Sequence, residues 1–101
     1  MTPREILVNA RAMIADPANF TLAARSLVDG VHNFTGAIWA QLGGRGGDER
    51  EPFFAADAAV MLAMHRRGYA SMNDLEQRGS HADALEIYDQ AIASSHHRAL
   101  G

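Results

Sequence analysis

The chain has 101 residues, with 9 basic and 12 acidic side chains and a formal net charge of −3 at pH 7. This length suits one domain, and an apolar fraction of 48% is typical of a globular protein and too high for a disordered one. The sequence has no cysteine and no lysine. Disulfide scaffolds, thiolate metal sites and any chemistry that needs a lysine amine are therefore excluded.

The distribution of charge and apolar residues also bears on partners and location. No basic run exceeds two residues, which disfavours nucleic-acid binding. The longest strongly apolar stretch, 52–64, contains Asp57 and is shorter than the roughly 20 residues needed to cross a bilayer. No cleavable signal pattern is present at the N-terminus. We expect a cytoplasmic protein that binds neither nucleic acid nor membrane.

The composition favours helices, because alanine is the best helix former and β-branched residues are sparse. No segment alternates apolar and polar residues for long enough to predict a strand. The first helix begins with a capping box, in which Thr2 is the N-cap, Pro3 the first helical residue and Glu5 the third. We predict its end at Asp16-Pro17, because the residue before a proline avoids the α conformation.

The middle of the chain combines two apolar segments with a glycine-rich stretch. The segment 18–30 predicts a short helix, which a turn signal at Asp29-Gly30 ends. Another helix is predicted over 33–42, where large apolar residues recur every four positions. Glycines then dominate, and their composition predicts a flexible loop at about 43–50.

The helix predicted over 52–67 is the most apolar part of the chain. It carries two phenylalanines, four other large apolar residues and five alanines, so it is apolar on nearly every side for three turns. Gly68 is expected to follow its last turn. A helix of this kind lies at the centre of its bundle or buries a second face against a partner.

The last helix is predicted to begin after Ser80, with Asp83 three residues on as an acidic form of the capping box. We expect it to fray near 94–97. Before it, Met72-Asn73-Asp74 has the composition of a turn. The buried face of the last helix is predicted to comprise Ala84, Leu85, Tyr88, Ala91 and Ile92.

Asp57 is the one acidic residue inside the most apolar helix, and it lies too far from the helix start to cap it. A buried carboxylate is costly unless it is paired or hydrogen-bonded. One interpretation places Asp57 on a thin polar edge, facing an arginine or solvent. The other places its carboxylate inside a pocket.

His65, Asn73 and Asp74 are the other candidate site residues. His65 either packs as an amphipathic side chain or serves as a titrating functional group. Asn73 and Asp74 either close a turn through their side-chain oxygens or contribute to a site. An enzyme would need such groups to converge on one cavity. The wider polar set that could join them comprises His32, Arg66 and Tyr69.

The sequence holds no pattern for a metal or a cofactor. His96 and His97 are adjacent and point to different faces of a helix, so they cannot chelate one ion as residues four apart would. No His-Glu-x-x-His motif occurs, and Gly43–Gly47 lacks the phosphate-binding loop pattern. We expect neither a metal nor a cofactor.

Four short motifs follow one another in a suggestive order. They are an Ile6–Ile14 helix ended by Asp16-Pro17, a Gly36-Ala37-Ile38 segment, the Met72-Asn73-Asp74 turn, and a helix led by Ser80-His81-Ala82-Asp83-Ala84-Leu85. This order resembles a family of short, uncharacterised bacterial and phage-associated helical proteins, classed as a domain of unknown function. Members often have a cysteine where this chain has Asn33. The resemblance implies an all-helical single domain and no particular activity.

We therefore expect one all-α domain over 1–101, with four to five helices packed around an apolar helix at about 52–67. The leading hypothesis is a non-enzymatic protein that works by binding, as a homo-oligomer through an apolar face of that helix. One alternative is a small enzyme with a polar pocket built from Asp57, His65, Asn73 and Asp74. The other is an accessory factor of a mobile element that binds a host protein.

Overall fold

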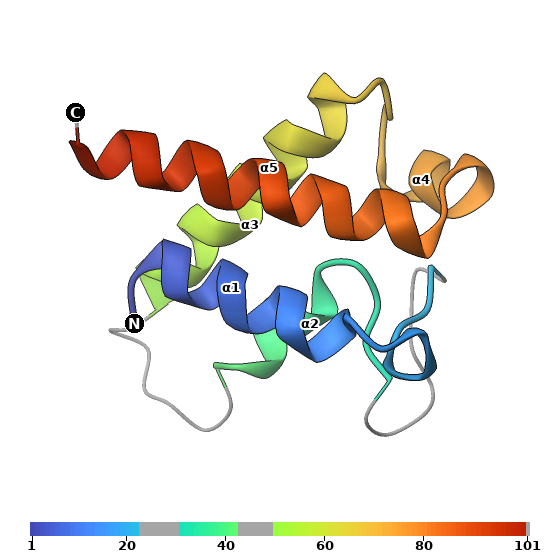
Figure 1. The fold of residues 1–101 in the computed structure, drawn as a ribbon, viewed down its shortest axis with the longest axis horizontal. Coiled ribbons are helices and arrows are strands. Elements are labelled where there is room, and N and C mark those ends of the chain that lie inside the picture. The colour runs from blue at the N-terminus through green and yellow to red at the C-terminus, as the bar shows by residue number, and fades with distance from the viewer. Residues whose placement is uncertain (23–30, 43–49, 101) are drawn as a thin grey trace.

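The computed structural model describes residues 1–22, 31–42 and 50–100, with the side chains of the last segment described as far as Ser95. Within these residues the chain forms five α-helices and no strand, so the predicted all-α class is confirmed (Figure 1). Of the helix predicted over 18–30, residues 23–30 lie outside the described residues, and 18–22 form no α-helix, because 18 and 19 belong to a 3-10 turn and Phe20 pairs with His32 in an isolated bridge. The glycine-rich loop predicted over 43–50 lies outside them except for Arg50. The elements are α1 (Pro3–Ile14), η1 (Pro17–Asn19, a 3-10 turn), α2 (Gly36–Ala40), α3 (Arg50–Arg66), α4 (Met72–Arg78) and α5 (His81–Leu100).

Helix α1 begins and ends where its local sequence dictates. The Thr2 hydroxyl accepts a hydrogen bond from the Glu5 amide at 3.1 Å, and the Glu5 carboxylate accepts one from the Thr2 amide at 3.0 Å. The predicted capping box is confirmed. After Ile14, the Asp16 carboxylate accepts from the Ala18 amide at 2.9 Å and starts η1, so the chain turns away from the helix axis.

Helix α2 is shorter than the helix predicted over 33–42. The Asn33 side-chain oxygen accepts a hydrogen bond from the Gly36 amide at 2.6 Å, so Asn33 precedes the helix instead of belonging to it. At the other end, the side-chain amide nitrogen of Gln41 donates a hydrogen bond to the main-chain carbonyl of Ile6 at 2.8 Å, which ties α2 to α1. The prediction was too long at both ends, because apolar periodicity carries no information about these side-chain hydrogen bonds.

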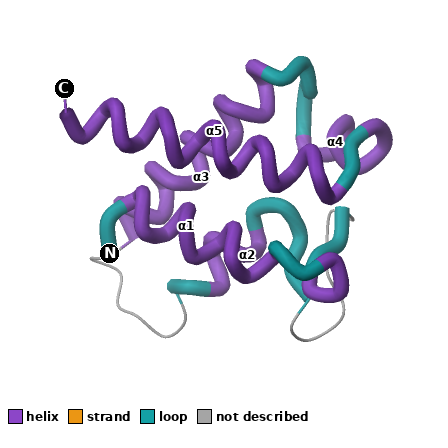
Figure 2. Tube along the Cα trace, viewed as in Figure 1, coloured by secondary structure: helices purple, strands orange, loops and turns teal. Residues whose placement is uncertain are grey.

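Helices α1 and α5 lie side by side and antiparallel, and α3 crosses both of them (Figure 1). Helix α3 also contacts α2, so it packs against three other helices. Short loops join α3, α4 and α5 into one continuous corner (Figure 2). The radius of gyration, 12.8 Å, matches the value of about 13 Å for a compact chain of 100 residues.

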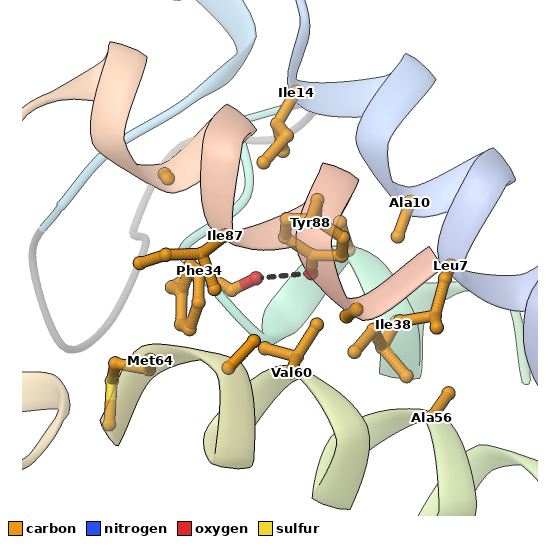
Figure 3. Close-up of a cluster of buried hydrophobic side chains, with 14 of the residues drawn as sticks. Leu7, Ala10, Ile14, Phe34, Ile38, Ala56, Val60, Met64, Ile87 and Tyr88 are labelled. Atoms are coloured by element: carbon orange, nitrogen blue, oxygen red, sulfur yellow. Dashed lines mark hydrogen bonds between the residues drawn. The ribbon is translucent and has the colours of Figure 1, made fainter. Parts of the chain in front are cut away.

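The core lies where α1, α3 and α5 meet. Side chains of all three helices point into it around the ring of Tyr88, whose hydroxyl reaches the chain just before α2 (Figure 3). The described residues bury apolar side chains and no charged one. The fully buried large side chains are Ile6, Leu7, Ile14, Phe34, Ile38, Phe53, Val60, Met64, Leu75, Ile87 and Tyr88.

Helix α4 occupies the place where a turn was predicted at Met72-Asn73-Asp74, so that prediction was wrong. The Ser71 hydroxyl accepts a hydrogen bond from the Asp74 amide at 3.1 Å, which makes Ser71 the N-cap of a helix. Short polar residues favour helix starts for the same reason that they favour turns, since their oxygens bond nearby amides. Burial of Leu75, which is 1% exposed, then selects the helix.

Helix α5 begins as predicted. The Ser80 hydroxyl accepts from the Asp83 amide at 3.2 Å and the Asp83 carboxylate accepts from the Ser80 amide at 3.0 Å, which completes the capping box. The helix runs on through 94–97 to Leu100, so the predicted fraying was wrong. Extending a helix that is already nucleated adds one hydrogen bond per residue, and serine and histidine cost little within it.

None of the helices in the described segments combines the length and the apolar character that crossing a bilayer would require.

Candidate functional site

Asp57 holds α3 to α2 through a tryptophan. Its carboxylate accepts a hydrogen bond from the indole nitrogen of Trp39 at 2.7 Å. The Trp39 ring stacks on Phe53, with ring centroids 6.2 Å apart, and meets the edge of Phe54 at 5.1 Å. Asp57 is half-buried at the edge of its helix, and its hydrogen-bond partner is an indole, where one interpretation had placed an arginine or solvent. This carboxylate therefore has a positioning role between two helices.

Asp57 also acts on the core electrostatically. Burial raises the pKa of the Tyr88 hydroxyl far above its ordinary value, and the negative charge of Asp57 adds to this effect. The Tyr88 hydroxyl is therefore protonated at any ordinary pH. It donates a hydrogen bond of 2.5 Å to the carbonyl oxygen of Phe34.

His65 lies exposed near the end of α3, with its Nδ1 atom 3.0 Å from the carbonyl oxygen of Tyr69. Since a carbonyl only accepts, Nδ1 carries the proton of this hydrogen bond. Asp57 and His65 are eight residues apart on one helix, a rise of about 12 Å. The two candidate residues consequently do not meet.

Asp74 stands in the first turn of α4 and is fully engaged by its own segment. Its two carboxylate oxygens accept from Arg78 at 2.6 and 2.7 Å, and one of them also accepts from the Ala70 amide at 2.8 Å. The hydrogen bonds from Arg78 and Ala70 hold the pKa of Asp74 well below its ordinary value. Asn73 is exposed on the same helix. Both residues therefore belong to the start of a helix.

A polar cluster at the α3–α4–α5 corner joins residues that sequence reasoning did not connect. The Tyr69 hydroxyl donates to Asp83 at 3.2 Å, and the Arg78 guanidinium lies 5.0 Å from the centre of the Tyr69 ring. Arg67 lies 3.5 Å from Asp83 and 2.7 Å from Glu86. Asp83 and Glu86 both belong to the last helix, and the sequence offers no signal that an arginine just after α3 reaches them.

The protonation states in this cluster follow from its contacts. Desolvation and the hydrogen bond to Asp83 raise the pKa of Tyr69. Desolvation pushes the pKa of Asp83 upward, but hydrogen bonds from Ser80 and Tyr69, together with the charge of Arg67, outweigh it and lower that pKa. The cluster is a set of charged and paired groups that fastens the corner.

The four candidate residues do not form one site. Asp57 lies against α2, His65 bonds the main chain after α3, and Asn73 and Asp74 lie on α4. Tyr69, from the wider polar set, comes near Asp74 only indirectly. The Arg78 guanidinium that binds Asp74 also lies over the Tyr69 ring. Within the described part of the chain, no three histidine, aspartate or glutamate side chains are grouped so that they could hold a metal ion.

A different feature stands out on α3. This helix carries Phe54, which is 60% exposed, and Leu62, which is 49% exposed, and these are the two most exposed large apolar side chains among the described residues. Ala58 lies midway between them and is exposed as well, as is Ala55. Four-residue spacing places Phe54, Ala58 and Leu62 on one side of the helix. We call Phe54, Ala55, Ala58 and Leu62 the outer face of α3.

The opposite side of α3 is buried in the core. Its inward residues are Phe53, Ala56, Val60, Ala63 and Met64, each less than 5% exposed. In Figure 3, Ala56 and Val60 point toward the side chains of α1 and α5. The helix is thus apolar on two sides, and the described chain covers one of them.

Comparison of the chain with protein-family models, curated proteins and solved structures found no match. The resemblance to a family of short helical proteins stays a prediction.

Proposed function

We propose that this protein is a non-enzymatic helical interaction protein that binds a second copy of itself through the outer face of α3. The observation that carries the proposal is the exposure of Phe54 and Leu62, at 60% and 49%, on a helix whose other side is in the core. Helices of a monomeric domain keep one apolar stripe and turn a polar face to water. A second, exposed apolar face on a helix is typical of a surface that binds another protein.

The size of this face sets the expected strength of the association. Complete burial of a phenylalanine or leucine side chain contributes about 1.5–3 kcal/mol, and roughly half of each side chain remains to be covered. Two copies of Phe54 and Leu62 would then contribute about 3–6 kcal/mol before the cost of association. Because association itself costs several kcal/mol, the other residues of the contact must also contribute, and we expect only a weak dimer, which forms between about 10 μM and 1 mM.

The binding hypothesis agrees better with the polar residues than the enzyme alternative does. Asp57 and Asp74 are occupied by hydrogen bonds that join helices or start one. An enzyme with a pocket built from Asp57, His65, Asn73 and Asp74 would need these side chains to share one cavity. Their separation over α3 and α4 supports a structural role for these side chains instead.

The test is the oligomeric state over this concentration range, measured by sedimentation equilibrium. Wild-type protein should shift from monomer toward dimer, and Leu62→Glu should remain monomeric because it places a charge in the contact. Val8→Glu is the matched control, since Val8 is 40% exposed but lies on α1. It should dimerise like the wild type.

A wild-type chain that stays monomeric up to about 1 mM would overturn self-association. In that case a different protein, such as a host factor, becomes the occupant to seek for the same face. Equal loss of the dimer in the Leu62 and Val8 variants would place the contact elsewhere on the surface.

A further inference from the structure

The outer face of α3 is symmetric about its central residue, Ala58. Phe54 lies four residues before Ala58 and Leu62 four residues after it. Glu51 and His65 lie seven residues before and after it, and both are exposed. Steps of four and seven residues stay on one side of a helix that turns 3.6 residues at a time. Along this face a small side chain lies between two large ones, with Glu51 at one end and His65 at the other.

We infer that two copies pair their α3 helices antiparallel, about a two-fold axis beside Ala58; this arrangement rests on the self-association proposed above. Antiparallel pairing about Ala58 sets Phe54 of one copy beside Leu62 of the other, twice, in the same contact. A two-fold contact requires a patch that complements itself. The small side chain of Ala58 lets the two helices approach closely where they cross.

Charge complementarity selects the antiparallel direction. At each end of the contact, Glu51 of one copy lies at the level of His65 and Arg66 of the other. A parallel pair would instead set Glu51 against Glu51 and Arg66 against Arg66. Opposite charges across an interface fix its register, whereas like charges oppose it.

The remaining charge near the contact is compatible with this arrangement. Arg50 lies eight residues before Ala58 and Arg66 eight residues after it. At 100° per residue, the two arginines lie on opposite edges of the face, about 80° to either side of its centre. In the antiparallel pair, Arg50 of one copy and Arg66 of the other therefore lie on opposite sides of the contact, with Glu51 between them.

The absence of cysteine from the chain makes the arrangement directly testable. In helices packed 8–10 Å apart, Cα atoms that face each other approach within about 5 Å, which suits a disulfide. Ala58→Cys alone should form a disulfide-linked dimer under mild oxidation with diamide. Glu51→Cys alone should not, but a mixture of Glu51→Cys and His65→Cys chains should link to each other.

The cross-linking experiment needs a control for chance collisions, and its outcomes separate the pairing direction from self-association. Asn73→Cys, exposed on α4, measures linkage by random collision, and Ala58→Cys should exceed it at least tenfold. Strong self-linkage of Glu51→Cys would indicate a parallel pair and overturn the inference. A dimer in sedimentation that does not link through Ala58→Cys would overturn this arrangement and leave self-association standing. A monomer would overturn both. Circular dichroism confirms that each variant folds.

A charge exchange tests the ends of the contact independently. Glu51→Arg should weaken dimerisation about tenfold, because it faces Arg66 and His65 of the other copy at both ends. Adding Arg66→Glu to it should restore the affinity to within about twofold. Failure of the second change to rescue the first would contradict the antiparallel register.

Discussion

The hydroxyl of Tyr88 links the middle of α5 to the chain before α2. Tyr88 is fully buried, and its hydroxyl donates to the carbonyl oxygen of Phe34, 54 positions away in sequence. The two rings also meet edge to face, with centroids 5.6 Å apart. A buried carbonyl without a donor is costly, so this single hydroxyl matters to stability.

Tyr88→Phe should lower the free energy of unfolding by about 1–3 kcal/mol, because it leaves the Phe34 carbonyl buried without a partner. Urea denaturation followed by circular dichroism measures the change. Tyr69→Phe is the control, since its hydroxyl bonds Asp83 near the surface, and it should have a smaller effect. A Tyr88→Phe chain as stable as the wild type would show that water reaches Phe34.

Asp74 provides a pH-dependent contribution to stability. Its pKa in the folded protein lies well below the ordinary value because of Arg78 and the Ala70 amide. A group with a depressed folded pKa stabilises the fold above its unfolded pKa, about 3.9, and loses that contribution as pH falls toward the folded value.

Asp74→Asn should therefore lower the melting temperature at pH 7, and its deficit relative to wild type should shrink as the pH is lowered below about 4. Melting curves between pH 2.5 and 7 measure both effects. A deficit that stays constant down to pH 2.5 would mean that Asp74 carries no charge-dependent stability.

Single residues explain which parts of the candidate site were predictable. The caps at Thr2 and Ser80 depend on atoms three residues away, and the sequence predicted both. The partner of Asp57, by contrast, is Trp39, 18 positions away and on another helix. No spacing rule connects two such residues, because packing of α2 on α3 brings them together.

At the scale of elements, Gly68 marks the end of α3. Its φ is +94°, the one positive φ among the described residues, in a region that side chains with a Cβ disfavour. A Cβ built there would meet no atom within 4 Å, so the cost of a side chain is in the main chain alone. The sequence predicted this glycine as the residue that follows the helix.

Gly68→Ala should lower the free energy of unfolding by about 1–2 kcal/mol, the cost of the left-handed conformation for an L-residue. Gly68→Asn should cost less, because asparagine tolerates this conformation better. Both can be measured by urea denaturation. Equal costs for the two variants would point to a steric cause instead of a conformational one.

The short helices α2 and α4 were the elements least accessible to prediction. Each spans fewer than eight residues, so little apolar periodicity accumulates in it. Their bounds are fixed by side-chain hydrogen bonds, from Gly36 to Asn33 and from Asp74 to Ser71. In the long helices, with three or more turns of apolar spacing, the starts and the ends of α1 and α3 were located to within one or two residues, whereas α5 runs at least three residues past its predicted end.

For the whole molecule, the proposed dimer makes stability depend on protein concentration. Because folding and association are linked, a tenfold rise in concentration should raise the melting temperature of a populated dimer by about 3 °C. Leu62→Glu should show no such rise. A wild-type melting temperature that is independent of concentration up to about 1 mM would argue against the dimer.

The sequence by itself determined the all-α class, the starts of α1 and α5, the end of α3 and three of the five residues predicted for the buried face of α5, namely Ala84, Tyr88 and Ala91. These depend on hydrogen bonds within one helical turn and on apolar spacing along one helix. The tertiary structure alone decided which distant polar groups meet, as in the 2.6 Å ion pair of Arg11 with Asp89 and the bond of Trp39 to Asp57. It also decided which side of the doubly apolar α3 is buried. Helices α1 and α5 can cover only one side of α3, and the other faces outward.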